Sequence, residues 1–102
     1  LSYGRKRALE IATTLALDPE LLLLDEPTAG MGHEDVDRIA ALIKKVGASR
    51  TVLMVEHNLK VVANLSHIIT VLARGEVLAE GDYSAVSKNK DVIQAYMGSD
   101  HE

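Results

Sequence analysis

The sequence predicts an α/β fold, in which a mainly parallel sheet is flanked by helices and carries a small antiparallel hairpin at its edge. Helical periodicity alternates along the chain with short apolar runs. The runs 21–24 and 51–55 have the pattern of strands buried on both faces of a parallel sheet. Two later runs, 68–72 and 76–79, are separated by Ala73-Arg74-Gly75, a turn of hairpin length.

The first two elements are a helix and a buried strand. Apolar residues recur at helical spacing between Arg5 and Leu17, so the first helix is expected there. It should end at Asp18-Pro19, because a residue that precedes proline is disfavoured in the helical conformation. The strand 21–24 then ends in Asp25 and Glu26, which puts two carboxylates at its C-terminal tip.

The remaining helices follow from spacing and charge. Apolar residues at helical spacing from Val36 to Val46 mark a second helix, with acidic residues at positions 34, 35 and 37 in its first turn, lysines in its last turn and Gly47 as its C-cap. A third helix should open near Asn58, directly after the strand 51–55. Residues 82–87 and 89–97 show helical spacing with a polar interruption, and the chain is expected to fray from Gly98 on.

Composition narrows the classes of function. The 102 residues are 47% hydrophobic with no Cys, Phe or Trp, so they can form one small aliphatic core without disulfides, which favours a reducing compartment. The net charge of −4 and the scattered basic residues argue against a nucleic-acid partner. No apolar run is long enough to cross a bilayer, so a role at a membrane would require docking.

Polar residues end both buried strands, at the rim where such sheets bind ligands. Asp25 and Glu26 follow the first strand, and Glu56 and His57 follow the second, so carboxylates and an imidazole should meet there. Many phosphate-handling enzymes present a magnesium ligand and a water-activating group as Asp then Glu. Asp25 is therefore the candidate metal ligand, and the alternative is an acidic loop start.

The residues before the first helix form a second candidate site. In Leu1-Ser2-Tyr3-Gly4-Arg5, a hydroxyl, a glycine that permits close backbone approach and free helix N–H groups would point to a common place, which suits an anion. Taken in isolation, this stretch is better explained as a serine N-cap beside a glycine. His57 in isolation is likewise better explained as a structural histidine.

The order of these motifs resembles that of ATP-binding-cassette (ABC) ATPases. Residues 1–5 resemble the signature motif, 21–27 the Walker B strand, 28–30 the D-loop and 55–57 the segment with the switch histidine. The resemblance covers nearly the whole chain.

This resemblance implies the C-terminal part of a P-loop NTPase (RecA-like) domain. The signature motif and its helix would occupy 1–17, the catalytic core strands and helices 18–81, and a helical tail 82–102. Such ATPases work as head-to-tail pairs, each ATP lying between the phosphate loop of one cassette and the signature of the other. ATP and Mg²⁺ are therefore the implied cofactors.

The resemblance also implies roles for individual residues. Ser2 and Gly4 would grip the γ-phosphate of an ATP held by a second ATPase subunit, with Tyr3, Arg5 and Gly30 beside them in the nucleotide site. At the strand tips, the resemblance assigns Mg²⁺ binding through water to Asp25, polarisation of the attacking water to Glu26 and contact with the γ-phosphate to His57.

The chain departs from the family at three places. Tyr3 and Arg5 stand where the signature usually has Gly and Gln, and Gly30-Met31-Gly32 stands where the D-loop usually continues with Leu-Asp. Gly-Met at this point resembles the subgroup that serves branched-chain amino acid uptake, as does the ending at residues 91–98. An importer ATPase of that subgroup is therefore the leading hypothesis.

The alternatives are an importer ATPase for urea or another amide, a non-transport ABC ATPase acting on DNA or ribosomes, and a non-catalytic regulatory half. For the leading hypothesis the partners are a second ABC ATPase subunit, as a homo- or heterodimer, and membrane permease subunits, with no nucleic acid. The protein would then lie peripherally on the cytoplasmic face of the inner (plasma) membrane.

No Gly-x-x-x-x-Gly-Lys-Ser/Thr phosphate loop occurs in the 102 residues. The chain opens on Leu1 and is expected to be part of a longer protein. By itself it should bind ATP weakly and hydrolyse none. Unpaired strand edges and apolar faces should also make it self-associate.

Overall fold

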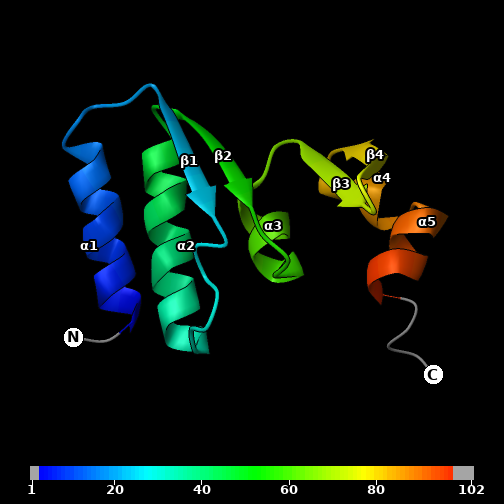
Figure 1. The fold of residues 1–102 in the computed structure, drawn as a ribbon, viewed down its shortest axis with the longest axis horizontal. Helices are drawn as coiled ribbons and strands as arrows, with labels where there is room; N and C mark the ends of the chain where they lie inside the picture. Colours follow the sequence, from blue (N-terminus) through cyan, green and yellow to red (C-terminus); the bar gives the residue numbers. More distant parts are fainter. Residues whose placement is uncertain (1–2, 98–102) are drawn as a thin grey trace. The chain divides into compact units, whose positions relative to one another are not determined.

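The computed structural model describes residues 3–97, and the chain divides into two compact units, residues 1–61 and 62–102. Figure 1 labels the elements. Their bounds are α1 (Tyr3–Leu15), β1 (Leu21–Asp25), α2 (His33–Gly47), β2 (Thr51–Val55), α3 (Leu59–Leu65), β3 (Ile69–Ala73), β4 (Glu76–Gly81), α4 (Tyr83–Ser87), α5 (Lys90–Val92) and a π-helical turn (Ile93–Met97).

The first unit is an αβαβ arrangement. β1 and β2 pair in parallel, from Leu21 opposite Thr51 to Asp25 opposite Val55, and α2 connects them. α1 and α2 lie side by side, and their N-termini point toward the same end of the unit as the carboxyl ends of the strands (Figure 1). The buried core of this unit consists of aliphatic side chains: Ile11, Leu22, Ile39, Ala40, Ile43, Val46 and Val61. The predicted α/β class is confirmed.

Only one face of β1 and β2 is covered by described residues of this unit. Leu22 is buried, whereas Leu21 and Leu23, on the opposite face, are 52% and 65% exposed. Leu53 and Val55 of β2 are exposed in the same way. The expectation of strands buried on both faces is therefore wrong for these residues. Side chains alternate between the faces of a sheet, and no described element of the unit covers the second face.

Helix ends differ from the predictions by a few residues. α1 begins and ends two residues earlier than expected, and the chain after it passes through Asp18 at a positive φ of 51°. Gly47 is the last residue of α2 and not its C-cap. The cap is Ala48 in the right-handed helical conformation, and its N–H donates to the Lys45 carbonyl at 3.4 Å. A final tight turn therefore ends this helix without a left-handed glycine.

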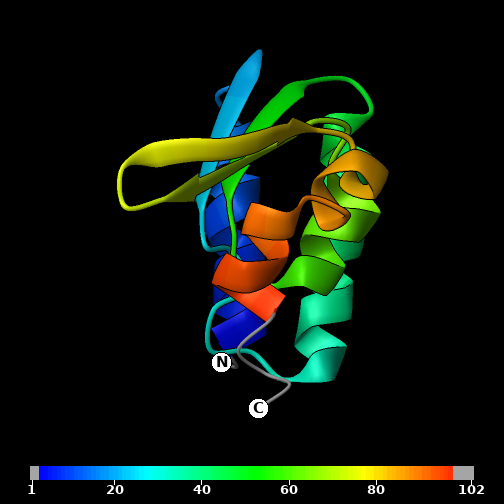
Figure 2. The same ribbon diagram turned by 90° about the vertical axis from the view of Figure 1, so that its right-hand side faces the viewer.

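The second unit contains the predicted antiparallel hairpin. β3 and β4 pair with each other in a separate two-stranded sheet, with Ile69 opposite Gly81. The loop between the strands is Arg74-Gly75, two residues and not the three expected. Both have positive φ, 53° and 78°, as a type I′ turn requires. Figure 2 shows this turn at one end of the hairpin and α4 at the other.

Two short helices follow the hairpin, as the spacing predicted. The Asp82 carboxylate caps α4 by accepting from the Ala85 N–H at 2.8 Å. The Asn89 side chain caps α5 by accepting from the N–H groups of Asp91 and Val92. The expected fraying from Gly98 on lies outside the described residues. None of the helices within residues 3–97 is long and apolar enough to span a membrane.

Candidate functional site

The chain leaves β1 through an unusual backbone conformation at Glu26. The Glu26 N–H donates to the Val55 carbonyl at 2.7 Å, which extends the strand pairing by one residue. Its φ is +45°, in the left-handed region that non-glycine residues occupy rarely and that costs free energy. Glu26 is thus held in a strained conformation at the rim where ligand binding was predicted.

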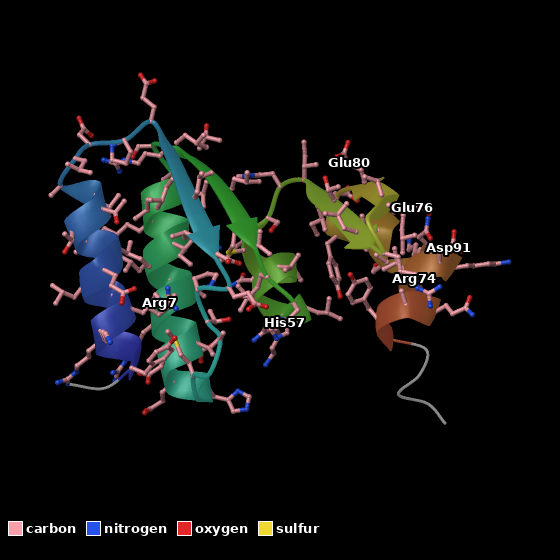
Figure 3. All side chains as sticks on the ribbon, in the orientation of Figure 1. Arg7, His57, Arg74, Glu76, Glu80 and Asp91 are labelled. Carbon is pink, nitrogen blue, oxygen red and sulfur yellow. The ribbon has the colours of Figure 1, made fainter. Side chains whose placement is uncertain are left out.

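Glu26 contacts His57 at this rim. The His57 Nδ1 atom lies 2.7 Å from the Glu26 Oε1 atom, a distance at which an Nδ1–H group donates to the carboxylate. The Glu26 and His57 side chains are 47% and 68% exposed, so a ligand can reach the pair. Figure 3 shows His57 on the short segment that joins β2 to α3. The predicted meeting of a carboxylate and an imidazole is confirmed as a contact.

Asp25 is the last residue of β1 and directly precedes Glu26 in the sequence. Its side chain is exposed. Within residues 3–97, no group of three or more His, Cys, Asp or Glu side chains could hold a metal ion. Mg²⁺ keeps several waters and is commonly bound through one or two carboxylates together with substrate phosphates. A single exposed Asp25 carboxylate fits that mode of binding.

Glu56 joins the loops that carry Glu26 and His57, a role that the sequence did not indicate. Its Oε2 atom accepts from the Thr28 hydroxyl at 2.7 Å and from the Thr28 N–H at 3.3 Å. Its Oε1 atom accepts from the N–H groups of His57 at 3.1 Å and Asn58 at 3.3 Å. We call these four hydrogen bonds the Glu56 bridge. The only sequence signal was the position of Glu56 at a strand tip.

The second candidate site lies at the N-terminus of α1. Gly4 is buried, and a Cβ atom at this position would lie 2.5 Å from the Asp35 Cγ atom of α2. Gly30 has a φ of +76°, and a Cβ there would lie 3.8 Å from the Tyr3 Cε2 atom. The structure therefore brings Tyr3, Gly4 and Gly30 together, because the loop after β1 packs against the start of α1.

Tyr3 is also held by its own helix. The Arg7 guanidinium donates to the Tyr3 hydroxyl at 3.1 Å, and its carbon lies 5.7 Å from the centroid of the Tyr3 ring. Arg7 also pairs with Glu10 at 3.5 Å (Figure 3 labels Arg7). Arg5 is exposed on the same helix, and Ser2 lies outside the described residues. Tyr3 thus lies beside Gly30 and also contacts Arg7 of its own helix.

Comparisons with known proteins agree with the family resemblance. The sequence profile described as "ABC transporter" matches residues 1–29, and the profile described as "Branched-chain amino acid ATP-binding cassette transporter" matches residues 76–102. The chain is 42% identical, over 100 residues and 96% of its length, to the high-affinity branched-chain amino acid transport ATP-binding protein BraF of Pseudomonas aeruginosa. The chain belongs to the ABC transporter family.

Other members of the family match over the same extent. LivG of Escherichia coli, also named as a high-affinity branched-chain amino acid transport ATP-binding protein, is 39% identical over 96% of the chain. The crystal structure of an ATP-binding cassette of an ABC transporter in the ADP conformation superposes with a TM-score of 0.84 at 28% identity, covering 96% of this chain and 41% of that one. The chain spans 39% of the length of BraF and of LivG.

Proposed function

We propose that this chain is part of the ATP-hydrolysing subunit of an ABC importer for branched-chain amino acids. The observation that carries the proposal is the 2.7 Å contact between Glu26 and His57 at the carboxyl ends of two parallel strands. That rim is where sheets of this kind bind their ligands. The names of BraF and LivG support the choice of solute.

Each residue at the rim has a proposed task. The Glu26 carboxylate orients the attacking water and accepts its proton, which its exposure and its position beside Asp25 allow. His57 donates through Nδ1 to Glu26, so the direction of its ring is set and Nε2 can contact the γ-phosphate.

Asp25 is the proposed magnesium ligand, through a water molecule. Bound Mg²⁺ would neutralise charge on the phosphate oxygens. We assign nucleotide contacts to Ser2, Tyr3, Gly4, Arg5 and Gly30, on the ATP of a second ATPase subunit. The position of Gly30 beside Tyr3 supports this assignment, because it sets the loop that follows β1 against the start of α1.

The partners and location follow from the same proposal. The intact subunit would pair with a second ABC ATPase subunit and dock on membrane permease subunits from the cytoplasmic side. The 102 residues alone are proposed to be inactive, because they contain no phosphate loop.

A transport measurement tests the proposed solute. The full-length protein, assembled with its permease subunits in vesicles, should drive ATP-dependent uptake of labelled leucine. A matched reaction with labelled urea should show no uptake above the background without ATP. Urea uptake without leucine uptake would reject the branched-chain assignment, and ATP-driven export of leucine would reject the direction.

A binding measurement tests the metal ligand. Mg-ATP should raise the melting temperature of the full-length protein, and the Asp25→Asn variant should lose most of that increase. The control is Asp37→Asn, which changes an exposed aspartate on α2 and should keep the increase in melting temperature. An undiminished increase in Asp25→Asn would remove Asp25 from the metal site.

A further inference from the structure

The contact between Glu26 and His57 needs support from elsewhere in the fold. Both side chains are substantially exposed, and exposed ion pairs and hydrogen bonds contribute little to holding two side chains in one geometry. The two residues also come from different loops, 31 positions apart in the sequence. A stable contact therefore requires that the two loops themselves be tied together.

The Glu56 bridge ties these two loops through a single carboxylate. Among the described residues 3–97, one oxygen accepts from Thr28 alone, in the loop after β1, and the other accepts from His57 and Asn58 alone, in the loop after β2. Thr28 is two residues from Glu26, and Glu56 directly precedes His57. The bridge thus fixes the backbone next to both members of the contact.

The chemistry of the bridge requires a carboxylate. Each oxygen of an ionised carboxylate can accept two hydrogen bonds, whereas an amide offers one accepting oxygen and one donating NH₂ group. Thr28 is only 5% exposed, so its hydroxyl needs a protein partner, and Glu56 provides it. The oxygen of a glutamine side chain could accept the hydrogen bonds from one loop. Its NH₂ group would then face the hydrogen-bond donors of the other loop.

We propose that Glu56 is a positioning residue that keeps His57 against Glu26 by joining the loop after β1 to the loop after β2. This inference rests on the proposed function, in which that contact serves ATP hydrolysis. Thr28 is the second member of the device, because it supplies the buried hydroxyl on the β1 side. Neither residue needs to touch the nucleotide.

The test uses the full-length protein and two variants that break the bridge from opposite sides. Glu56→Gln removes one accepting oxygen, and Thr28→Val removes the hydroxyl while keeping the shape of the side chain. Thr28→Ser keeps the hydroxyl and serves as the rescue variant. Glu20→Gln, an exposed change just before β1, is the matched control.

The first readout is the ¹⁵N NMR spectrum of the His57 imidazole. In Glu56→Gln and Thr28→Val the ring resonances should move toward those of a Glu26→Ala reference, in which the contact is absent. They should stay at their native positions in Thr28→Ser and Glu20→Gln. A loss of stability alone would not produce this pattern, because it leaves the folded His57 ring in its native environment.

The second readout is steady-state ATP hydrolysis. Displaced catalytic groups should lower kcat by roughly 10- to 100-fold in Glu56→Gln and Thr28→Val, with the KM for ATP changed less than about twofold. The double variant should be little worse than either single variant, because both changes break one device. Thr28→Ser and Glu20→Gln should remain within about twofold of the native kcat.

The outcomes separate the bridge from the proposed function. Unmoved His57 resonances in folded Glu56→Gln and Thr28→Val would overturn the positioning role, whatever the rates are. If the His57 resonances shift in these two variants but the native full-length protein hydrolyses no ATP, the positioning role is upheld and the proposed function is rejected. If Glu56→Gln does not fold, the comparison of Thr28→Val with Thr28→Ser decides.

Discussion

At the scale of single residues, Glu26 combines a strained backbone with the side chain that we propose activates water. Left-handed conformations of non-glycine residues cost of order 1–3 kcal/mol and persist where the surrounding structure fixes them. Here the hydrogen bond from the Glu26 N–H to the Val55 carbonyl fixes the backbone of the residue, and its side chain contacts His57. The strain is consistent with a site whose geometry is set before the ligand arrives.

Two substitutions at Glu26 isolate the backbone strain. Glu26→Gly and Glu26→Ala both remove the contact with His57, but only glycine adopts a φ of +45° without steric cost. The glycine variant should therefore be more stable than the alanine variant by about 1 kcal/mol. Urea denaturation of the full-length variants measures the difference, and equal stabilities would contradict the strained conformation.

The sequence predicted part of this site. The meeting of Glu26 and His57 followed from the rule that parallel strands present their carboxyl ends at one rim. The left-handed conformation at Glu26 and the Glu56 bridge did not follow. No local pattern encodes them, because Thr28 and Glu56 are 28 positions apart and meet only once β1 and β2 have paired.

At the scale of secondary structure elements, Gly4 sets how closely α1 approaches α2. Gly4→Ala would place a Cβ atom 2.5 Å from the Asp35 Cγ atom, so the helices would have to move apart. We expect a loss of about 1–3 kcal/mol in the free energy of unfolding. Gly47→Ala is the control, since its Cβ would meet only Val52 at 3.8 Å.

Gly47→Ala should be neutral or should stabilise by up to about 1 kcal/mol, because alanine is the better helix former. Thermal or urea unfolding of the two full-length variants compares them directly. If Gly4→Ala were as stable as Gly47→Ala, the close contact between the helices would not exist in solution.

The hairpin of the second unit offers an independent test. Asn-Gly is the preferred pair for a type I′ turn, so Arg74→Asn should slow hydrogen exchange of the β3 and β4 amides. Arg74→Val should speed it, since β-branched residues resist positive φ. Faster exchange in Arg74→Asn than in the native chain would argue against this turn type.

The bounds of elements were predicted best where their signals were local. The strand 51–55 and the capped helices after Asp82 and Asn89 match, because apolar runs and capping side chains act within a few residues. The three-residue hairpin loop and the Gly47 cap were wrong. In both cases the backbone hydrogen bonds determine which of two neighbouring residues ends the element, and amino-acid composition does not distinguish between those residues.

At the scale of the whole molecule, the uncovered face of β1 and β2 decides how the 102-residue chain behaves alone. Leu21, Leu23, Leu53 and Val55 leave a contiguous apolar surface on a sheet of only two strands. Sedimentation velocity at micromolar concentration should therefore show dimers or larger species. Leu23→Lys combined with Leu53→Glu should shift the chain toward monomer. A native chain that sediments as a monomer would contradict this prediction.

We propose that Glu26, directly after β1, is the water-activating carboxylate of an ABC ATPase. The most direct test is steady-state ATP hydrolysis by the full-length protein with Glu26→Gln. The kcat should fall by at least about 100-fold while Mg-ATP still binds, because glutamine keeps the shape of the side chain but cannot accept a proton. A kcat equal to that of the native protein would show that Glu26 is not the base.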